Sequence, residues 1–224
     1  MKSQVDVRQR ILAENESRAA GIRERFAAQG TLVLNLISSP GSGKTTLLEE
    51  TVRGFAPRHR MGVLVGDVAT ERDAARLQAL QIPAYQILTG GACHLDARQI
   101  TAALERIDTD ELDFLFIENV GNLICPTAYE LGEDFKVALL SVAEGDDKPF
   151  KYPAIFSRAR ATVITKADLL AHTAFDMQAV REQIQSLQPE GALLVTSTRE
   201  APGIDAWLDF LSGALAAKRE AAGG

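Results

Sequence analysis

Short runs of apolar and β-branched residues alternate along the chain with longer stretches of helix-like composition. From residue 31 onward, seven of these runs have the length and composition of buried strands. They cover residues 31–37, 61–66, 84–89, 112–120, 135–143, 161–165 and 192–197. The helix-like stretches cover residues 44–54, 70–80, 92–106, 175–187 and 204–219. Strands that alternate with helices predict an α/β fold of three layers, in which a mainly parallel β-sheet is flanked by helices.

Three further segments stand outside this alternation. Residues 5–28 are rich in Arg, Glu and Ala, which predicts a solvated or partner-facing helix ahead of the core. Its sparse apolar positions are Val7, Ile11, Ile22 and Phe26. The stretch DDKPFKYP at 146–153 carries charge and two prolines, so we expect a surface loop rather than a strand. We expect the tail at 218–224 to be frayed.

Composition narrows the class of protein. The chain has 224 residues, of which 46% are hydrophobic and 24% charged, which fits one large domain with a substantial core. A net charge of -6 argues against a general nucleic-acid binder. Neither a charged-then-apolar leader nor an apolar run of membrane-spanning length is present, so we expect no signal peptide, no membrane span and a cytoplasmic location. Two cysteines do not make a disulfide framework.

The first apolar run leads into the sequence SSPGSGKTT at 38–46. A strand, a glycine-containing loop and a helix in this order form a phosphate-binding P-loop, because backbone N–H groups converge at the helix N-terminus. Gly41 and Gly43 allow the backbone to approach phosphate closely, and Ser42 lies between them. The usual pattern has glycine where this chain has Ser38, so we expect the entry to the turn to differ.

Three residues that follow the glycines carry the chemistry of the loop. We expect Lys44 to neutralise the β- and γ-phosphates and the Thr45 hydroxyl to bind Mg²⁺. Thr46 is a candidate contact to the α-phosphate. The sequence therefore predicts a nucleoside triphosphate site.

Carboxylates end two of the predicted strands. Asp67 and Glu118 follow apolar runs, and ligands bind at the carboxyl ends of parallel strands, so both are expected near the P-loop. They are candidates to hold Mg²⁺, directly or through water, and to orient the attacking water. Gly121 is a candidate to offer its backbone N–H to the γ-phosphate. Residues 66–74 then have the character of a switch segment, with Asp73 as an additional candidate ligand to a metal-bound water.

The motif Thr165-Lys166-Ala167-Asp168 follows a late strand and indicates which base is bound. A carboxylate at Asp168 can accept two N–H bonds from guanine that adenine does not offer. The stem of Lys166 is expected to lie against the base. G proteins usually carry Asn where this chain has Thr165, and Ser197 lies in a segment expected to contact the guanine oxygen.

One of the two cysteines opens a predicted helix, and the other closely follows the candidate glycine Gly121. Cys93 and His94 are adjacent and stand in the predicted helix 92–106, where a thiol in the first turn has a lowered pKa. Cys125 follows Gly121 by only a few residues. Two sulfurs and one nitrogen are soft ligands that suit Ni²⁺ or Zn²⁺, and the residues do not decide between these ions. Two buried structural cysteines are the alternative reading.

Several of these motifs together resemble one family. The sequences SSPGSGKTT, GDVATERDA, GGACHLDA, ENVGNLICP and EGDDKPFKYP occur here in the order found in the nickel-incorporation GTPases of hydrogenase maturation, the HypB family. The resemblance runs from about residue 10 to residue 212. It implies a SIMIBI-class P-loop GTPase. The chain then divides into a helical extension, a GTPase domain and a flexible tail at residues 1–30, 31–217 and 218–224.

The resemblance also implies a biological role and partners. Members of the family hydrolyse GTP slowly, dimerise with nucleotide bound and handle nickel for the large subunit of [NiFe]-hydrogenase, together with a small zinc-containing partner, HypA. The family's metal site in the GTPase domain corresponds to Cys93, His94 and Cys125. Many relatives have a second, N-terminal nickel site rich in cysteine or histidine. Residues 1–30 here contain neither residue type, so we expect that second site to be lacking.

Other readings of the same residues remain open. A metabolite kinase would share the P-loop but needs an acceptor pocket, and a nucleotide-dependent metal-binding scaffold would show little turnover. Related SIMIBI metallochaperones serve other metalloenzymes, such as urease. Lys148, in the 146–153 segment, is a candidate contact to a phosphate or to a partner. Because Cys125 follows Gly121 so closely, we expect the state of the γ-phosphate to alter the metal site.

Overall fold

A seven-stranded, all-parallel β-sheet forms the centre of the molecule. The computed structural model describes residues 4–67 and 72–223. The strands are β1 (Leu32–Ser38), β2 (Met61–Asp67), β3 (Ala84–Leu88), β4 (Phe114–Glu118), β5 (Phe135–Ser141), β6 (Ala159–Thr165) and β7 (Ala192–Val195). All seven predicted strands are confirmed, with ends that differ from the prediction by up to two residues.

The order of strands across the sheet is β3-β2-β4-β1-β5-β6-β7. The central strands β1 and β4 are buried along their whole length, which explains why their sequences are almost continuously apolar. Glu118, the last residue of β4, pairs in register with Leu36 of β1 and Val65 of β2. The ends of β1, β2 and β4 therefore meet at one edge of the sheet, where the P-loop begins.

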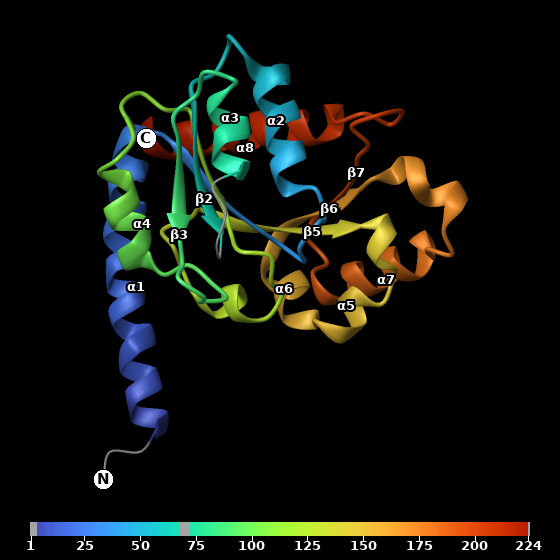
Figure 1. The fold of residues 1–224 in the computed structure, drawn as a ribbon, viewed down its shortest axis with the longest axis horizontal. Coiled ribbons are helices and arrows are strands. Elements are labelled where there is room, and N and C mark those ends of the chain that lie inside the picture. Colours follow the sequence, from blue (N-terminus) through green and yellow to red (C-terminus); the bar gives the residue numbers. More distant parts are fainter. Residues whose placement is uncertain (1–3, 68–71, 224) are drawn as a thin grey trace.

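Helices cover both faces of the sheet (Figure 1). One core cluster contains residues of α2, α3 and α8, and two other clusters contain residues of α1, α4, α6 and α7. The α-helices are α1 (Gln4–Gln29), α2 (Lys44–Phe55), α3 (Arg72–Gln78), α4 (Ala97–Leu104), α5 (Lys148–Lys151), α6 (Pro153–Arg158), α7 (Met177–Leu187) and α8 (Asp205–Gly223). The three-layer α/β prediction is confirmed. Among the described helices, none combines the length and the apolar character that crossing a membrane requires.

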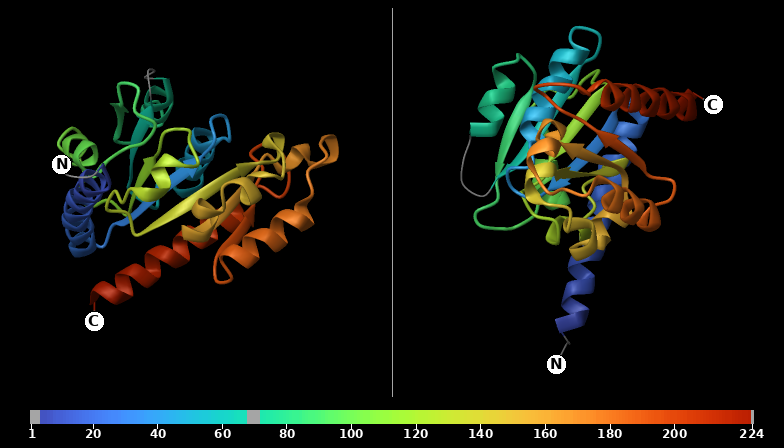
Figure 2. Two further views of the ribbon diagram at one scale, coloured as in Figure 1. Left: turned by 90° about the horizontal axis from the view of Figure 1, so that it is seen from below. Right: turned by 90° about the vertical axis from the view of Figure 1, so that its right-hand side faces the viewer.

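The N-terminal helix α1 packs on the sheet through a narrow stripe. Its buried residues Asn15, Ala19, Ile22 and Phe26 recur every three or four positions, so they share one face. The apolar members of the stripe join the core beside β1 and α4. Ile11, by contrast, is 53% exposed, and the N-terminal half of α1 extends beyond the body of the domain (Figures 1 and 2).

Two local predictions were wrong. Residues 218–223 are not frayed, because α8 continues to Gly223 and its Lys218 Nζ pairs with the Asp134 carboxylate at 2.6 Å. Arg219 in the same turn pairs with Asp113. Residues 146–153 are not a continuous loop, since Lys148–Lys151 forms the short helix α5. Its proline lies in the first turn, where no intrahelical N–H bond is lost.

Candidate functional site: a nucleotide cleft beside a Cys-His-Cys cluster

The loop between β1 and α2 has the backbone shape of a phosphate cradle. Gly41 and Gly43 adopt φ values of 77° and 93°, which side-chain-bearing residues rarely take. Helix α2 begins at Lys44, directly after Gly43, so the N-terminal end of its dipole faces the loop. The predicted strand-loop-helix order is therefore present, with residues 39–43 as the connection.

A local contact explains why this P-loop has Ser38 where the usual pattern has glycine. The Ser38 hydroxyl, fully buried at the end of β1, accepts a hydrogen bond from Lys44 Nζ at 2.8 Å. Burial lowers the pKa of Lys44, and the negative charge of Glu118 acts in the opposite direction. Ser38 thus holds the ammonium group of Lys44 over the loop.

A buried carboxylate stands opposite the start of α2. Thr45 Oγ1 donates to Glu118 Oε1 at 2.8 Å, while the buried Glu118 Oε2 has no hydrogen-bond partner among the residues that the structure describes. Burial raises the pKa of Glu118 to about 7 despite the positive charge of Lys44. A hydroxyl beside a carboxylate with a spare oxygen is a suitable oxygen ligand set for Mg²⁺, so these residues fit the predicted metal.

A cleft of about 450 Å³ joins these groups. Its walls contain the candidate residues Asp67, Asp73 and Gly121, together with Arg76 of α3, which was not among the predicted site residues. Arg76 Nη2 lies 3.2 Å from Thr46 Oγ1 and 2.7 Å from Glu49 Oε2. The spacing of Asp73 and Arg76, three residues apart on one helix face, was the signal that could have identified Arg76. The rest of the predicted switch, residues 68–71, lies outside the described part of the chain.

Gly121 lies against the entry of the P-loop. A Cβ atom at this position would stand 2.9 Å from both Cα and N of Pro40, so a larger residue requires a backbone shift. The segment from Gly121 to Cys125 therefore has one end packed on the phosphate loop.

A second cavity of about 320 Å³ lies beside the first and contains the predicted base-recognition motif. Asp168 Oδ1 accepts a hydrogen bond from Ser197 Oγ at 2.7 Å, which fixes the carboxylate. Thr165 Oγ1 donates to the Ser42 carbonyl at 2.6 Å, and Lys166 Nζ donates to the Gly41 carbonyl at 2.8 Å. Base pocket and phosphate loop are thus linked directly, and Ser197 orients Asp168 through its side chain.

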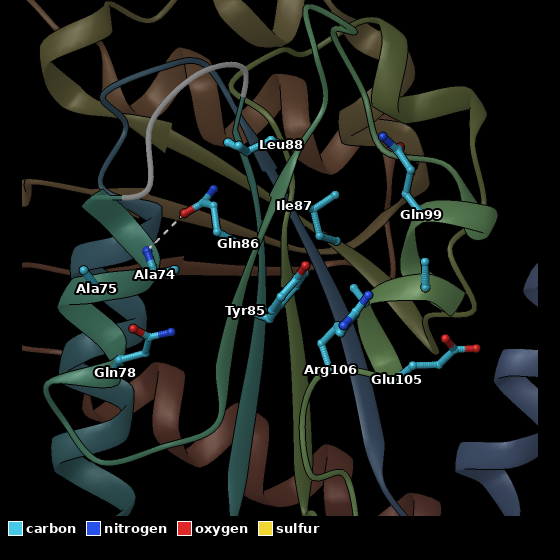
Figure 3. A pocket seen from close by; sticks show the side chains of 12 residues that line it. Ala74, Ala75, Gln78, Tyr85, Gln86, Ile87, Leu88, Gln99, Glu105 and Arg106 are labelled. Carbon is cyan, nitrogen blue, oxygen red and sulfur yellow. Dashed lines mark hydrogen bonds between the residues drawn. The ribbon is translucent and has the colours of Figure 1, made fainter.

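A hollow of about 610 Å³ between α3 and α4, over the edge strand β3, contains none of the nucleotide or metal candidates (Figure 3). In it, Gln86 Oε1 accepts from the Ala74 N–H at 3.3 Å, and Gln86 Nε2 donates to the Val65 carbonyl at 3.1 Å. Gln86 therefore fastens the start of α3, with Asp73, to strands β2 and β3.

The predicted metal ligands come together beyond Gly121. The ligand atoms of Cys93, His94 and Cys125 all lie within 4.8 Å of one another. Cys93 is exposed, whereas His94 and Cys125 are partly buried, so an ion can reach the cluster from solvent. Two sulfurs and an imidazole nitrogen with an open side suit a thiophilic divalent ion such as nickel or zinc.

One premise about these cysteines was wrong. Cys93 does not open a helix, because α4 begins at Ala97 with Asp96 as its N-cap and Gln99 completing a capping box. The pKa of Cys93 is raised, first by its hydrogen bond with Cys125 and then by burial. Burial also lowers the pKa of His94, which favours the neutral imidazole that binds metal.

Neighbouring side chains connect the two chain segments that carry the metal ligands. The Asn122 side chain donates to the Cys93 carbonyl at 3.2 Å and accepts from the Ile124 N–H at 2.8 Å. The ring of His94 stacks on Tyr129 with centroids 4.0 Å apart. Both contacts join the segment that contains Cys93 to the segment that contains Cys125. Neither was anticipated, because each joins residues about 30 positions apart.

Comparison with known proteins places this combination of sites in a family. The CobW/HypB/UreG nucleotide-binding domain matches residues 32–195. The hydrogenase maturation factor HypB of Azotobacter vinelandii is 47% identical over 205 residues, which is 92% of this chain and 68% of that protein.

Two solved structures agree over nearly the whole chain. The crystal structure of HypB from Helicobacter pylori in complex with nickel has a TM-score of 0.86 and 42% identity, covering 92% of this chain and 96% of that one. HypB from Archaeoglobus fulgidus has a TM-score of 0.85 and 37% identity, covering 91% of this chain and all of that one. With the P-loop, the base pocket and the Cys-His-Cys cluster, these matches show that the chain belongs to the HypB branch of the CobW/HypB/UreG family.

Proposed function

We propose that this chain is a GTP-hydrolysing metallochaperone that delivers nickel during the maturation of [NiFe]-hydrogenase. The observation that carries the proposal is the segment Gly121–Cys125. Its first residue packs on the P-loop and lines the phosphate cleft, and its last residue belongs to the Cys-His-Cys cluster. The relatives named hydrogenase maturation factors and the HypB structure with nickel support the same role.

The nucleotide half of the proposal assigns roles to the residues of the cleft. Lys44 neutralises the β- and γ-phosphates, the backbone from Gly41 to Gly43 donates to them, and Thr46 lies near the α-phosphate. Thr45 and Glu118 would hold Mg²⁺, with Asp67 acting through water. When bound, the ion neutralises charge that develops on the phosphate oxygens. Asp67 also orients the attacking water.

The base pocket selects guanine. Asp168, held by Ser197, accepts from the two N–H groups of the guanine edge, and the stem of Lys166 covers one face of the base. Thr165 fixes the loop by its bond to the Ser42 carbonyl rather than by contacting the base. This hydrogen bond between the base-recognition motif and the P-loop explains why Thr can replace the usual Asn at this position.

The metal half of the proposal follows from the position of Gly121. A γ-phosphate that accepts the Gly121 N–H displaces the segment leading to Cys125, because Pro40 leaves Gly121 little free space. Cys93 and His94 stand on a separate segment, so a shift of Cys125 changes the geometry of the ligand set. Nickel is the cargo, and its affinity then depends on the bound nucleotide.

The family resemblance supports the partners. We propose that two copies associate when GTP is bound, that nickel is exchanged with a small zinc-containing HypA-like protein, and that the recipient is the hydrogenase large-subunit precursor in the cytoplasm.

Native mass spectrometry of the purified chain tests these assignments. Spectra are recorded with GDP or a non-hydrolysable GTP analogue, each with and without Ni²⁺, and phosphate release from GTP is followed without any acceptor. We expect dimers with the GTP analogue, bound nickel, and phosphate release. Phosphate that appears only with an added acceptor would indicate a kinase. Nucleotide binding without single-turnover hydrolysis would indicate that the chain is a metal-binding scaffold and not a GTPase.

A further inference from the structure

A single buried side chain of α1 is hydrogen-bonded to both chain segments that carry the metal ligands. Asn15 is 7% exposed and lies on the buried stripe of the helix. Its Oδ1 accepts a hydrogen bond from the Ala97 N–H at 2.8 Å. Its Nδ2 donates to the Glu130 carbonyl, also at 2.8 Å. The two partners lie on different segments of the chain and are joined here by one amide group.

Each partner stands a short distance along the chain from a metal ligand. Ala97 is the first residue of α4 and follows His94 by three residues. Its N–H has no partner within the helix, so Asn15 supplies the missing acceptor. Glu130 follows Cys125 by five residues.

The stretches between these contacts and the ligands have little freedom. Leu95 is fully buried, and its N–H points to Asn119 Oδ1 at 3.4 Å. Thr127 is buried, and its hydroxyl donates to the Leu123 carbonyl at 3.1 Å. A shift of Ala97 or Glu130 is therefore transmitted toward the ligands instead of being absorbed by loose chain.

Removal of the Asn15 amide leaves the buried Ala97 N–H and the partly buried Glu130 carbonyl without this partner. An unpaired buried N–H or carbonyl is costly, so the two segments are expected to move apart until water reaches Ala97 N–H and the Glu130 carbonyl. That movement separates the segment of Cys93 and His94 from the segment of Cys125. The bond between Asn122 and the Cys93 carbonyl lies on the more exposed side of the cluster and does not replace this inner contact.

We propose that Asn15 is a positioning residue for the metal site, which holds the two ligand-bearing segments at the separation that Ni²⁺ requires. This inference rests on the proposed metal-binding function and adds a residue from outside the GTPase core motifs. Because an outer partner that orients metal ligands commonly changes affinity by 10- to 100-fold, we expect its loss to weaken Ni²⁺ binding by about 10-fold.

The test compares Asn15→Ala and Asn15→Leu with the parent, all as the full chain without nucleotide. Leucine keeps the branched, four-heavy-atom shape of asparagine with somewhat larger end groups and forms no hydrogen bonds, so comparison with alanine separates packing from bonding. Arg25→Ala is the matched control, because Arg25 lies on the same helix and its Nη2 donates to Thr109 Oγ1, away from both ligand-bearing segments. Ni²⁺ affinity is measured by competition with a chromophoric chelator, and the nickel–thiolate absorption bands and GDP affinity are recorded for each variant.

We expect both Asn15 variants to lose about 10-fold in Ni²⁺ affinity with altered nickel–thiolate bands, while GDP affinity stays within about twofold of the parent. Arg25→Ala is expected to match the parent in all three measurements. A parent chain that binds no Ni²⁺ would refute the metal function itself. A parent that binds Ni²⁺ no better than either Asn15 variant would overturn the positioning role alone.

Three other results would also overturn it. Recovery of parent affinity in Asn15→Leu would assign the effect to packing. An equal loss in Arg25→Ala would assign it to the docking of α1 in general. Loss of GDP binding together with Ni²⁺ binding would place the defect in the fold as a whole.

Discussion

The nucleotide cleft and the Cys-His-Cys cluster lie at either end of one short segment, yet they are built differently. In the cleft, Lys44, Thr45 and Glu118 are each at least 93% buried, and all three side chains are hydrogen-bonded within the protein. In the cluster, Cys93 is exposed, Cys93 and His94 lie on the irregular connection between β3 and α4, and Cys125 begins a short 3-10 helix in the connection after β4. The cleft is preorganised, whereas the cluster depends on the positions of two loops.

This difference follows from what each site must do. Phosphate transfer requires charges fixed in place, since a preorganised environment stabilises the transition state without reorganisation. A metal that is carried must also leave, so its ligands need two arrangements of different affinity. The contacts that hold the cluster come from two segments, since Asn122 and Tyr129 both lie between β4 and β5, whereas Asn15 lies in α1. A shift of either segment alters the ligand set.

The largest expected effect is in the preorganised nucleotide cleft. Lys44→Ala removes the buried ammonium group and is expected to lower GTP hydrolysis by about 10³-fold, because the β- and γ-phosphates lose their fixed counter-charge. Steady-state phosphate release measures this, with circular dichroism to verify folding. Lys218→Ala, which breaks the pair with Asp134, is the lysine control and should hydrolyse GTP like the parent. Turnover by Lys44→Ala at the parent rate would place phosphate binding elsewhere.

Burial of Glu118 gives the nucleotide cleft a contribution to folding stability that depends on pH. With a pKa of about 7 when folded and an ordinary value of 4.5, the native state holds a proton that the unfolded chain has lost between these values. The free energy of unfolding of the nucleotide-free protein should therefore fall as pH rises through this window, by on the order of 3 kcal/mol from this group.

Urea unfolding at several pH values between 4 and 8, without nucleotide or Mg²⁺, measures this dependence. Glu118→Gln keeps the shape of the side chain and should remove that part of the slope. Identical pH profiles for the variant and the parent would mean that Glu118 titrates normally.

On the metal side, His94→Ala is expected to weaken Ni²⁺ binding by about 100-fold, since a ligand and not only its support is lost. GDP affinity should not change, because His94 does not line the nucleotide cavities. His172→Ala alters an exposed histidine and is the matched control. If isothermal titration gave the two variants the same Ni²⁺ affinity, the cluster would not be the metal site.

The smallest effect is expected in the choice of base. Asp168→Asn replaces a double acceptor by a group that also donates, so preference for GTP over xanthosine triphosphate should fall by about 10-fold. Competition against a fluorescent GDP analogue measures both affinities. An unchanged ratio would move base recognition away from Asp168.

Sequence alone predicted the parts of the molecule that are determined by residues close to one another along the chain. The seven apolar runs became seven strands because buried parallel strands need continuous apolar sequence, and the P-loop followed from its glycines. The start of α4 was missed although Asp96 and Gln99 carry a capping-box signal. Prolines in the 146–153 segment predict a loop, whereas Pro149 occupies the first turn of helix α5.

The rest depends on contacts between distant positions. Lys218 and Arg219 keep the tail helical by pairing with Asp134 and Asp113, more than 80 residues earlier. Asn15 reaches Ala97 and Glu130 across similar separations. A polar residue on a largely polar helix has no local feature to show that it is buried and hydrogen-bonded to two distant segments, so only the three-dimensional structure identifies it.

The central claim is that nucleotide state and metal affinity are coupled through the segment Gly121–Cys125. Titration of Ni²⁺ into the full chain, saturated with GDP or with a non-hydrolysable GTP analogue, tests it most directly. We predict affinities that differ by about 10-fold, with tighter binding in the GTP-analogue state, so that hydrolysis favours release of the ion. Equal affinity and equal stoichiometry in the two states would contradict the account.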